Sequence, residues 1–160
     1  MLIVGIDPPN GIATMDGNGR LLSVKTSDFW DIAATLSIIA ENNKQDRLSA
    51  IVYIEAPQVH KSLYARHNGK NNRIQKRIAQ NVGANKQTSQ LLIERCQRLG
   101  IPCIPLPPRK HNTTKKNPAE FGRVTGWESK TSSHGRDAAG LILSRNWRHD
   151  LATLSQKKGS

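Results

Sequence analysis

Two short apolar stretches decide the fold: residues 2–7 read LIVGID and residues 50–55 read AIVYIE. Each is an apolar run of five residues that ends in a single carboxylate. Unbroken apolar runs of this length are typical of strands covered on both faces, which are central and parallel in α/β sheets. We therefore expect Asp7 and Glu55 to lie side by side at the carboxyl end of the sheet, where the ligands of α/β proteins usually bind.

The segments around these two strands alternate between strand and helix periodicity. Turn residues at 16–19 predict a hairpin between strands 12–15 and 21–24. A helix is expected from a cap at Ser27 or Asp28 to about residue 42, because apolar residues recur there at helical spacing. Helical spacing recurs over residues 73–99, with a break near Gly83 left open, and Gly100 is the expected helix end.

The last third of the chain completes one α/β domain. Residues 101–106 contain two prolines and predict an edge strand, residues 107–126 a loop with one helical turn near Glu120, and residues 133–147 a last helix. This order predicts a mixed, five-stranded sheet flanked by helices over residues 1–150, followed by a flexible basic tail at 151–160.

Composition excludes several classes of protein. The 160 residues suit a single domain, and no apolar run reaches the ~18 residues that a membrane span needs. The apolar start meets Asp7 without a basic leader, so we expect no signal peptide and a cytoplasmic protein. Cys96 and Cys103 stand outside any metal-binding spacing, which makes a disulfide scaffold or a cysteine zinc site improbable.

The chain is strongly basic, with 24 Lys and Arg against 12 Asp and Glu and a formal net charge of +12. Residues 56–116 hold 13 of these basic residues and one acid, Glu94. A field of one sign attracts polyanions, of which nucleic acid is the commonest. A merely solvated surface is the alternative, and an anionic membrane is a weaker one, because the basic residues alternate with Asn, Gln and Gly.

A third candidate element is residues 133–140, SHGRDAAG. His134 and Asp137 are three residues apart at the start of the expected helix and so share a face. Alone, they are ordinary residues of a first helical turn. Together with Asp7 and Glu55 they favour a divalent-cation site, because neighbouring carboxylates repel each other unless a cation holds them.

These residues resemble three short motifs of one family. GIDP at residues 5–8, IE at 54–55 and HGRDAA at 134–139 resemble the motifs of RuvC-type Holliday-junction resolvases, within the ribonuclease H-like superfamily. The resemblance covers residues 1–147 and is closest to compact phage-encoded members. Pro9 departs from the glycine often found after the Asp-Pro pair, and Gly140 from an Ala- or Asp-rich position.

The resemblance implies a ribonuclease H-like fold and a homodimer that nicks four-way DNA junctions in the cytoplasm of a bacterial or phage-infected cell. It implies hydrolysis with two Mg²⁺ ions, which Mn²⁺ can replace, held by Asp7, Glu55 and Asp137. His134 falls where members have a fourth acid or a histidine, and would bind metal or position water. Trp30 is expected in the core or at the dimer contact rather than in the site.

DNA binding is expected of the basic segment after Glu55, through backbone phosphates. Tyr64 is the candidate aromatic wedge for the junction centre, with a tyrosine packed at a loop base as the alternative. The expected phosphate contacts are Arg66, Lys70, Arg73, Lys76, Arg77, Lys110, Lys115 and Lys116. Two other functions stay open: a ribonuclease H-like nuclease for other branched DNA or RNA–DNA hybrids, and a basic nucleic-acid-binding module without catalysis.

Overall fold

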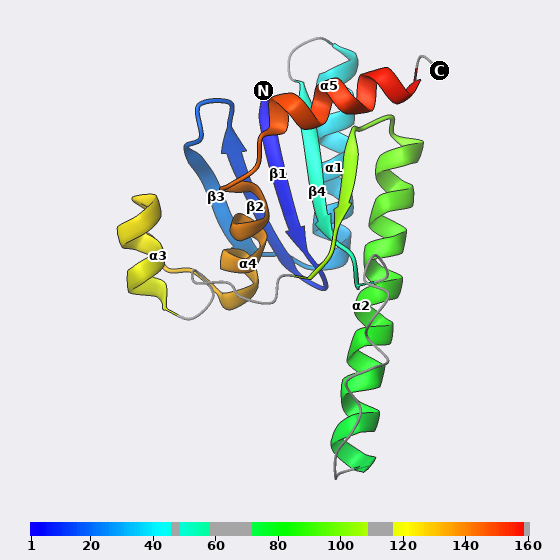
Figure 1. The fold of residues 1–160 in the computed structure, drawn as a ribbon, viewed down its shortest axis with the longest axis vertical. Helices are drawn as coiled ribbons and strands as arrows, with labels where there is room; N and C mark the ends of the chain where they lie inside the picture. The colour runs from blue at the N-terminus through cyan, green and yellow to red at the C-terminus, as the bar shows by residue number, and fades with distance from the viewer. Residues whose placement is uncertain (46–48, 58–71, 109–116, 159–160) are drawn as a thin grey trace.

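The core of the protein is a mixed sheet of five strands in the order β3-β2-β1-β4-β5 (Figure 1). The computed structural model describes residues 1–45, 49–57, 72–108 and 117–158. The strands are β1 Leu2–Asp7, β2 Gly11–Asp16, β3 Leu21–Thr26, β4 Ala50–Glu55 and β5 Cys103–Leu106. β1 is antiparallel to β2 and parallel to β4, which confirms the expected α/β architecture with a mixed sheet.

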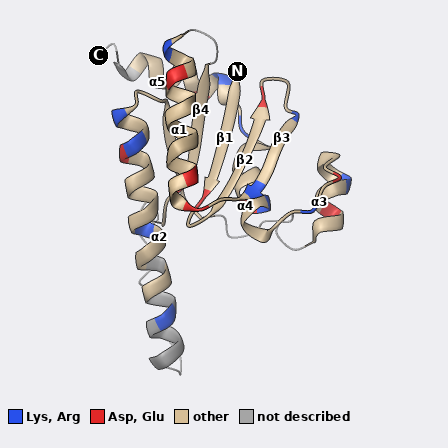
Figure 2. Ribbon diagram, turned by 180° about the vertical axis from the view of Figure 1, so that it is seen from behind, with Lys and Arg blue, Asp and Glu red and all other residues tan. Residues whose placement is uncertain are grey.

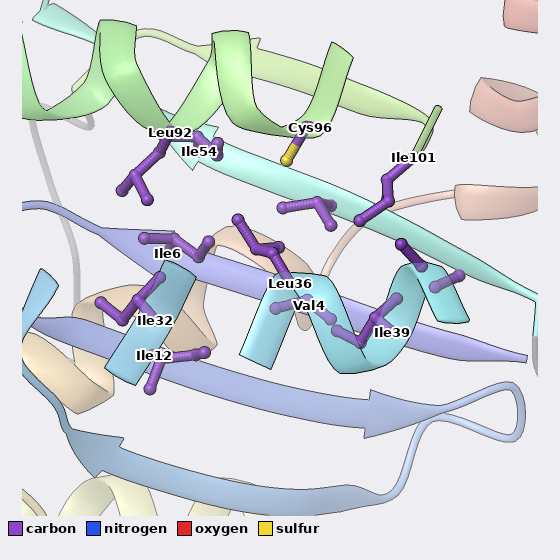
Figure 3. Packing of buried hydrophobic residues seen from close by; sticks show 13 residues of the cluster. Val4, Ile6, Ile12, Ile32, Leu36, Ile39, Ile54, Leu92, Cys96 and Ile101 are labelled. Atoms are coloured by element: carbon purple, nitrogen blue, oxygen red, sulfur yellow. The ribbon is translucent and has the colours of Figure 1, made fainter. Parts of the chain in front are cut away.

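Helices cover both faces of this sheet (Figure 1). They are α1 Phe29–Lys44, α2 Asn72–Arg98, α3 Pro118–Thr125, α4 Ser133–Ile142 and α5 Trp147–Lys158. Val4 and Ile6 of β1 pack with Ile32 and Leu36 of α1 in one buried core (Figure 3). The alternate residue Ile3 packs against α4 and α5 in a second core. Two buried faces explain why β1 and β4 are apolar throughout.

The carboxyl-terminal helix differs from the sequence expectation. The chain forms two helices in place of the single helix expected over 133–147, and α5 continues through most of the expected tail at 151–160. Asn146 caps α5, since its side-chain oxygen accepts the backbone N–H of His149 at 3.3 Å. Leu151 and Leu154 then pack against the second core, and this burial stabilises α5. The polar composition of the segment gave no sequence signal for this helix.

Two further elements are more regular than expected. α2 continues as one helix through Gly83, so the break that the sequence left open does not occur. α3 has eight residues instead of one turn. Asn117 caps it with Pro118 in the first turn, and Gly126 ends it in the left-handed conformation, a combination that favours a helix.

The amino-terminal half of α2 projects past the carboxyl ends of β1 and β4 (Figure 1). The described side chains of this half, including Arg77, Gln80 and Asn81, are exposed. Within the described part of the chain, none of the helices combines the length and the apolar character needed to cross a bilayer.

Candidate metal centre

The carboxylates of Asp7 and Glu55 stand at neighbouring strand ends, as expected. Ile6 of β1 pairs with Ile54 of β4, so the residue that follows each of them occupies the next position of the ladder. Side chains alternate along a strand, and Ile3 and Tyr53 belong to the second core. Asp7 lies four positions after Ile3, and Glu55 two positions after Tyr53. Their side chains therefore point to the same face of the sheet as Ile3 and Tyr53, which is the face that α4 covers.

Two glycines let α4 lie directly on the sheet. A Cβ atom at Gly5 would overlap the backbone carbonyl of Ala138, and one at Gly11 would overlap the carbonyl of His134. α4 therefore approaches the sheet closely, and the determinants on the sheet side are glycines to which sequence reasoning gave no structural role. Their signal was a glycine inside an apolar strand and another at a strand start, positions that often mark close backbone contact.

Side-chain hydrogen bonds fix the first turn of α4. The Ser132 hydroxyl accepts the backbone N–H of Gly135 at 3.0 Å, as a helix cap does. The Thr26 hydroxyl at the end of β3 donates to the Ser132 oxygen at 2.6 Å. The buried Arg136 donates to the carbonyl and the hydroxyl of Thr131, at 2.9 and 3.0 Å. These contacts set the position from which α4 presents its polar side chains to β1.

Asp7, His134 and Asp137 meet at this junction of α4 and β1. His134 Nδ1 lies 2.9 Å from Asp7 Oδ2. One ligand atom from each of the three residues lies within 4.8 Å of the other two. Both aspartates are 6% exposed, whereas the His134 side chain is 46% exposed, so the group is buried on the acid side and open to solvent at the imidazole.

The donor set of this group fits a divalent cation. Two carboxylates in one buried site repel each other, and a bound cation removes that repulsion. Carboxylate oxygens are the ligands that Mg²⁺ and Mn²⁺ take in proteins, and a neutral imidazole is a common further metal ligand. Asp7, His134 and Asp137 can therefore hold such an ion between β1 and α4.

Glu55 stands apart from this group. Its side chain is partly buried at the end of β4. Among the described residues, the set whose ligand atoms lie within 4.8 Å of one another contains Asp7, His134 and Asp137 but not Glu55. The structure thus brings together three of the four expected site residues and places the fourth on the adjacent strand.

Most of the expected DNA contacts cannot be placed. Tyr64, Arg66, Lys70, Lys110, Lys115 and Lys116 lie outside the described residues. Arg73 and Lys76 fall on α2, but their side chains also lie outside the described part. Arg77 is exposed on the projecting half of α2.

Three other titratable groups have structural roles. The Tyr53 hydroxyl donates to Asp150 at 2.7 Å, and burial together with that carboxylate raises the pKa of Tyr53. The adjacent Cys96 thiol and burial raise the pKa of Cys103, so this thiol is a poor nucleophile, and Cys96 itself is buried.

Comparisons with known proteins do not extend the geometric description. No protein-family model matches the chain, and no curated protein matches it. The function is therefore inferred from the site itself.

Proposed function

We propose that the protein is a divalent-cation-dependent endonuclease of ribonuclease H-like fold that resolves four-way DNA junctions by paired nicks. The observation that carries the proposal is the meeting of Asp7, His134 and Asp137 at the carboxyl end of the central strand. The sequence resemblance to RuvC-type resolvases supports the same assignment, since it rests on these residues and on Glu55.

The placement of Glu55 supports a site for two cations. Asp7 lies between the α4 residues and the neighbouring strand end, so it is the acid that two ions would share. His134 and Asp137 would complete one set of ligands and Glu55 the other. Bound Mg²⁺ or Mn²⁺ supplies electrostatic stabilisation of the scissile phosphate and activation of a water molecule.

His134 and the packing of α4 can also contribute to such a site directly. The His134 side chain is 46% exposed, so as an alternative to binding a cation it can position a water molecule. The hydrogen bond between His134 Nδ1 and Asp7 fixes the ring, so that Nε2 is the nitrogen left either to bind a cation or to position a water molecule. The close packing of α4 on Gly5 and Gly11 keeps these groups in register.

The charge of the molecule supports a polyanionic substrate. α2 has no acidic residue before Glu94, and its amino-terminal half projects beyond the strand ends that carry Asp7 and Glu55 (Figure 1). Arg77 and Lys86 are exposed on this helix. Such a basic helix beside a site for cations suits a nucleic acid whose backbone runs from the helix to the site.

Cleavage of defined DNA structures tests the proposal. A labelled immobile four-way junction and a linear duplex of the same sequence are incubated with protein, in Mg²⁺ or in EDTA. Wild type is expected to cut the junction in Mg²⁺ with paired nicks, and Asp7→Asn to bind the junction without cutting it. Asp16→Asn is the matched control, because Asp16 is a partly exposed acid that pairs with Leu2 at the opposite end of β1.

The other outcomes decide between the alternatives. Cuts at flaps, forks or RNA–DNA hybrids that also disappear in Asp7→Asn would keep the active site and change the substrate. Tight junction binding without cleavage in any metal would refute catalysis and leave a nucleic-acid-binding module.

A further inference from the structure

A pocket lies near the candidate metal centre, on the side of the sheet that α1 covers. Its volume is about 460 Å³, within the range of about 300–1,000 Å³ that is typical of small-ligand sites. Pro9 and Asn10, in the turn after β1, form one wall, and Ser27 and Asp28, in the loop before α1, form another. The Ser27 backbone N–H donates to the Asn10 carbonyl at 2.8 Å and so joins the two walls. The pocket is therefore built on the turn that begins after Asp7.

Three side chains of the pocket supply hydrogen-bond acceptors. Asp28 caps α1 with one carboxylate oxygen, which accepts the Asp31 backbone N–H at 2.8 Å, and its second oxygen is outside that bond. Asp31, in the first turn of α1, makes no ion pair with a described residue. The Asn10 side-chain oxygen is buried and accepts no hydrogen bond from the described part of the chain. A buried acceptor without a donor is unfavourable, so a ligand that brings a donor is favoured here.

Two hydroxyl groups of the pocket are acceptors as well. The Thr88 hydroxyl of α2 donates to a backbone carbonyl one turn earlier in the helix at 3.0 Å, and the Thr26 hydroxyl donates to the Ser132 oxygen at 2.6 Å. A hydroxyl has a single proton, so the oxygens of both threonines are left to accept. The pocket thus suits a ligand edge that carries N–H groups, whereas an edge of carbonyl oxygens would meet acceptors.

Aromatic rings stand at the rim of this pocket. Phe29 lines it, and the Trp30 ring packs edge-on against the Phe29 ring with a centroid distance of 5.2 Å. Trp30 is 77% exposed, so most of its indole is open to solvent. Nucleobases stack on exposed aromatic rings, and the amino groups of adenine, cytosine and guanine are hydrogen-bond donors.

The charge of the molecule favours a nucleic-acid strand over a small cation as the ligand. A chain with a net charge of +12 repels free cations and attracts polyanions. Figure 2 shows acids at the start of α1 and basic residues along α2. The exposed Arg77 lies eleven residues before Thr88, about three helical turns, and so on the same face of α2. The acids keep phosphates out of the pocket, whereas Arg77 can bind the backbone of a strand whose base enters it.

We propose that this pocket binds one unpaired nucleobase that carries an amino group, with the neighbouring base of the strand stacked on Trp30. The amino group of the bound base donates to the Asp31 carboxylate. Uracil and thymine have no amino group and present two carbonyl oxygens around a single N–H, so the acceptors of the pocket disfavour them. The consequence for cleavage rests on the proposed function, because a base held here would fix an unpaired strand at the same end of the sheet as Asp7.

Binding of short single strands in EDTA tests the proposal without cleavage. Two labelled oligonucleotides of equal length, one of deoxycytidine and one of deoxyuridine, differ only in the base edge that the pocket would read. Fluorescence anisotropy is expected to show about 10-fold tighter binding of the cytosine strand, the discrimination of a good hydrogen-bonded base contact. Equal affinities, or tighter binding of the uracil strand, overturn the proposal.

A change of one carboxylate tests the base contact. Asp31→Asn replaces an obligate acceptor by an amide that also donates, and is expected to abolish the preference for cytosine. Glu41→Gln is the matched control, because Glu41 is an exposed acid near the other end of the same helix, and it should keep the preference. A preference that survives Asp31→Asn, or disappears in Glu41→Gln, contradicts the proposed contact.

Substitutions at Trp30 test the stacking. Trp30→Ala should weaken the binding of both strands by about 10-fold, and Trp30→Phe, which keeps an aromatic ring, should restore most of it. Ile38→Ala, at an exposed apolar residue two turns further along α1, is the control and should bind as wild type does. In wild type, both strands should quench tryptophan fluorescence. Unchanged affinity in Trp30→Ala, or an indole that no strand quenches because another molecule covers it, refutes the stacking.

Failure of this proposal can be told from failure of the proposed function. A cytosine preference that Asp31→Asn abolishes, in a protein that cuts no DNA, upholds the pocket and refutes the nuclease. Junction cleavage by a protein that binds the cytosine and uracil strands equally upholds the nuclease and refutes the pocket.

Discussion

Replacement of Gly5 by alanine is expected to move His134 and Asp137 away from Asp7 in the candidate metal centre. The new methyl group would lie about 1 Å inside the closest approach that Cβ atoms make to a backbone carbonyl, here that of Ala138. Because the obstacle is helix backbone, α4 as a whole must shift and carry His134 and Asp137 away from Asp7. Metal–oxygen distances tolerate only about 0.2 Å, so a shift of this size disrupts the site.

The magnitude follows from two effects. Overpacking of a close contact costs about 1–3 kcal/mol of folding free energy, which lowers Tm by about 2–12 °C for a chain of this size. A misplacement of about 1 Å in a catalytic group reduces the rate by about 10²-fold. Gly5→Ala should therefore keep the circular-dichroism spectrum of the fold, melt earlier and lose most junction cleavage.

Gly83→Ala is the control for this experiment. A methyl group at Gly83 of α2 would meet no atom within 4 Å, so alanine should stabilise the helix by about 0.5–1 kcal/mol and leave cleavage unchanged. Thermal unfolding followed by circular dichroism and the nicking rate in Mg²⁺ measure both variants. Wild-type Tm and wild-type cleavage in Gly5→Ala would refute the contact between β1 and α4.

Three further perturbations test other parts of the structure. Asp137→Asn should reduce Mg²⁺-dependent nicking by about 10² or more while junction binding, measured by gel shift in EDTA, is retained. Ser132→Ala removes the cap of α4 and the acceptor of the Thr26 hydroxyl, and should lower stability to urea by about 1 kcal/mol; an unchanged midpoint contradicts the cap. The folded state raises the pKa of Tyr53, so it holds the phenol proton more tightly than the unfolded chain does. The contribution of this phenol to folding stability is complete below about pH 10 and is lost as the pH rises further. Tyr53→Phe should therefore abolish this part of the decline in Tm at alkaline pH.

The sequence could predict those elements whose signals are local. The apolar runs that end at Asp7 and Glu55 define the two central strands, because burial on both faces leaves no polar position. The spacing of His134 and Asp137 places both on one helix face, as the structure confirms. Their proximity to Asp7 was expected only from the grouping of acids and from the resemblance. No local sequence pattern can predict a contact between residues so far apart in the chain.

The parts that sequence reasoning missed depend on tertiary contact. Leu151 and Leu154 carry too little periodicity to mark α5, and it is their packing on the second core that keeps this segment helical. Gly5 reads in the sequence as one more residue of an apolar strand, although its role is to admit the backbone of α4. Trp30 is exposed and not in the core, which was one of its two expected places, because the orientation of α1 turns it outward; a dimer contact at Trp30 stays a prediction.

The contact between Asp7 and His134 joins residues 127 positions apart in the chain. Asp7 belongs to the first strand, whereas the residues it meets belong to a helix near the end of the sequence. A chain that is still being synthesised therefore has half of the centre and no partner for it, and a product truncated before residue 134 stays in that state. The three residues that could hold a metal are therefore brought together only when the last helices dock. Under the proposed function, the chain would remain inactive throughout its own synthesis and gain activity only on complete folding.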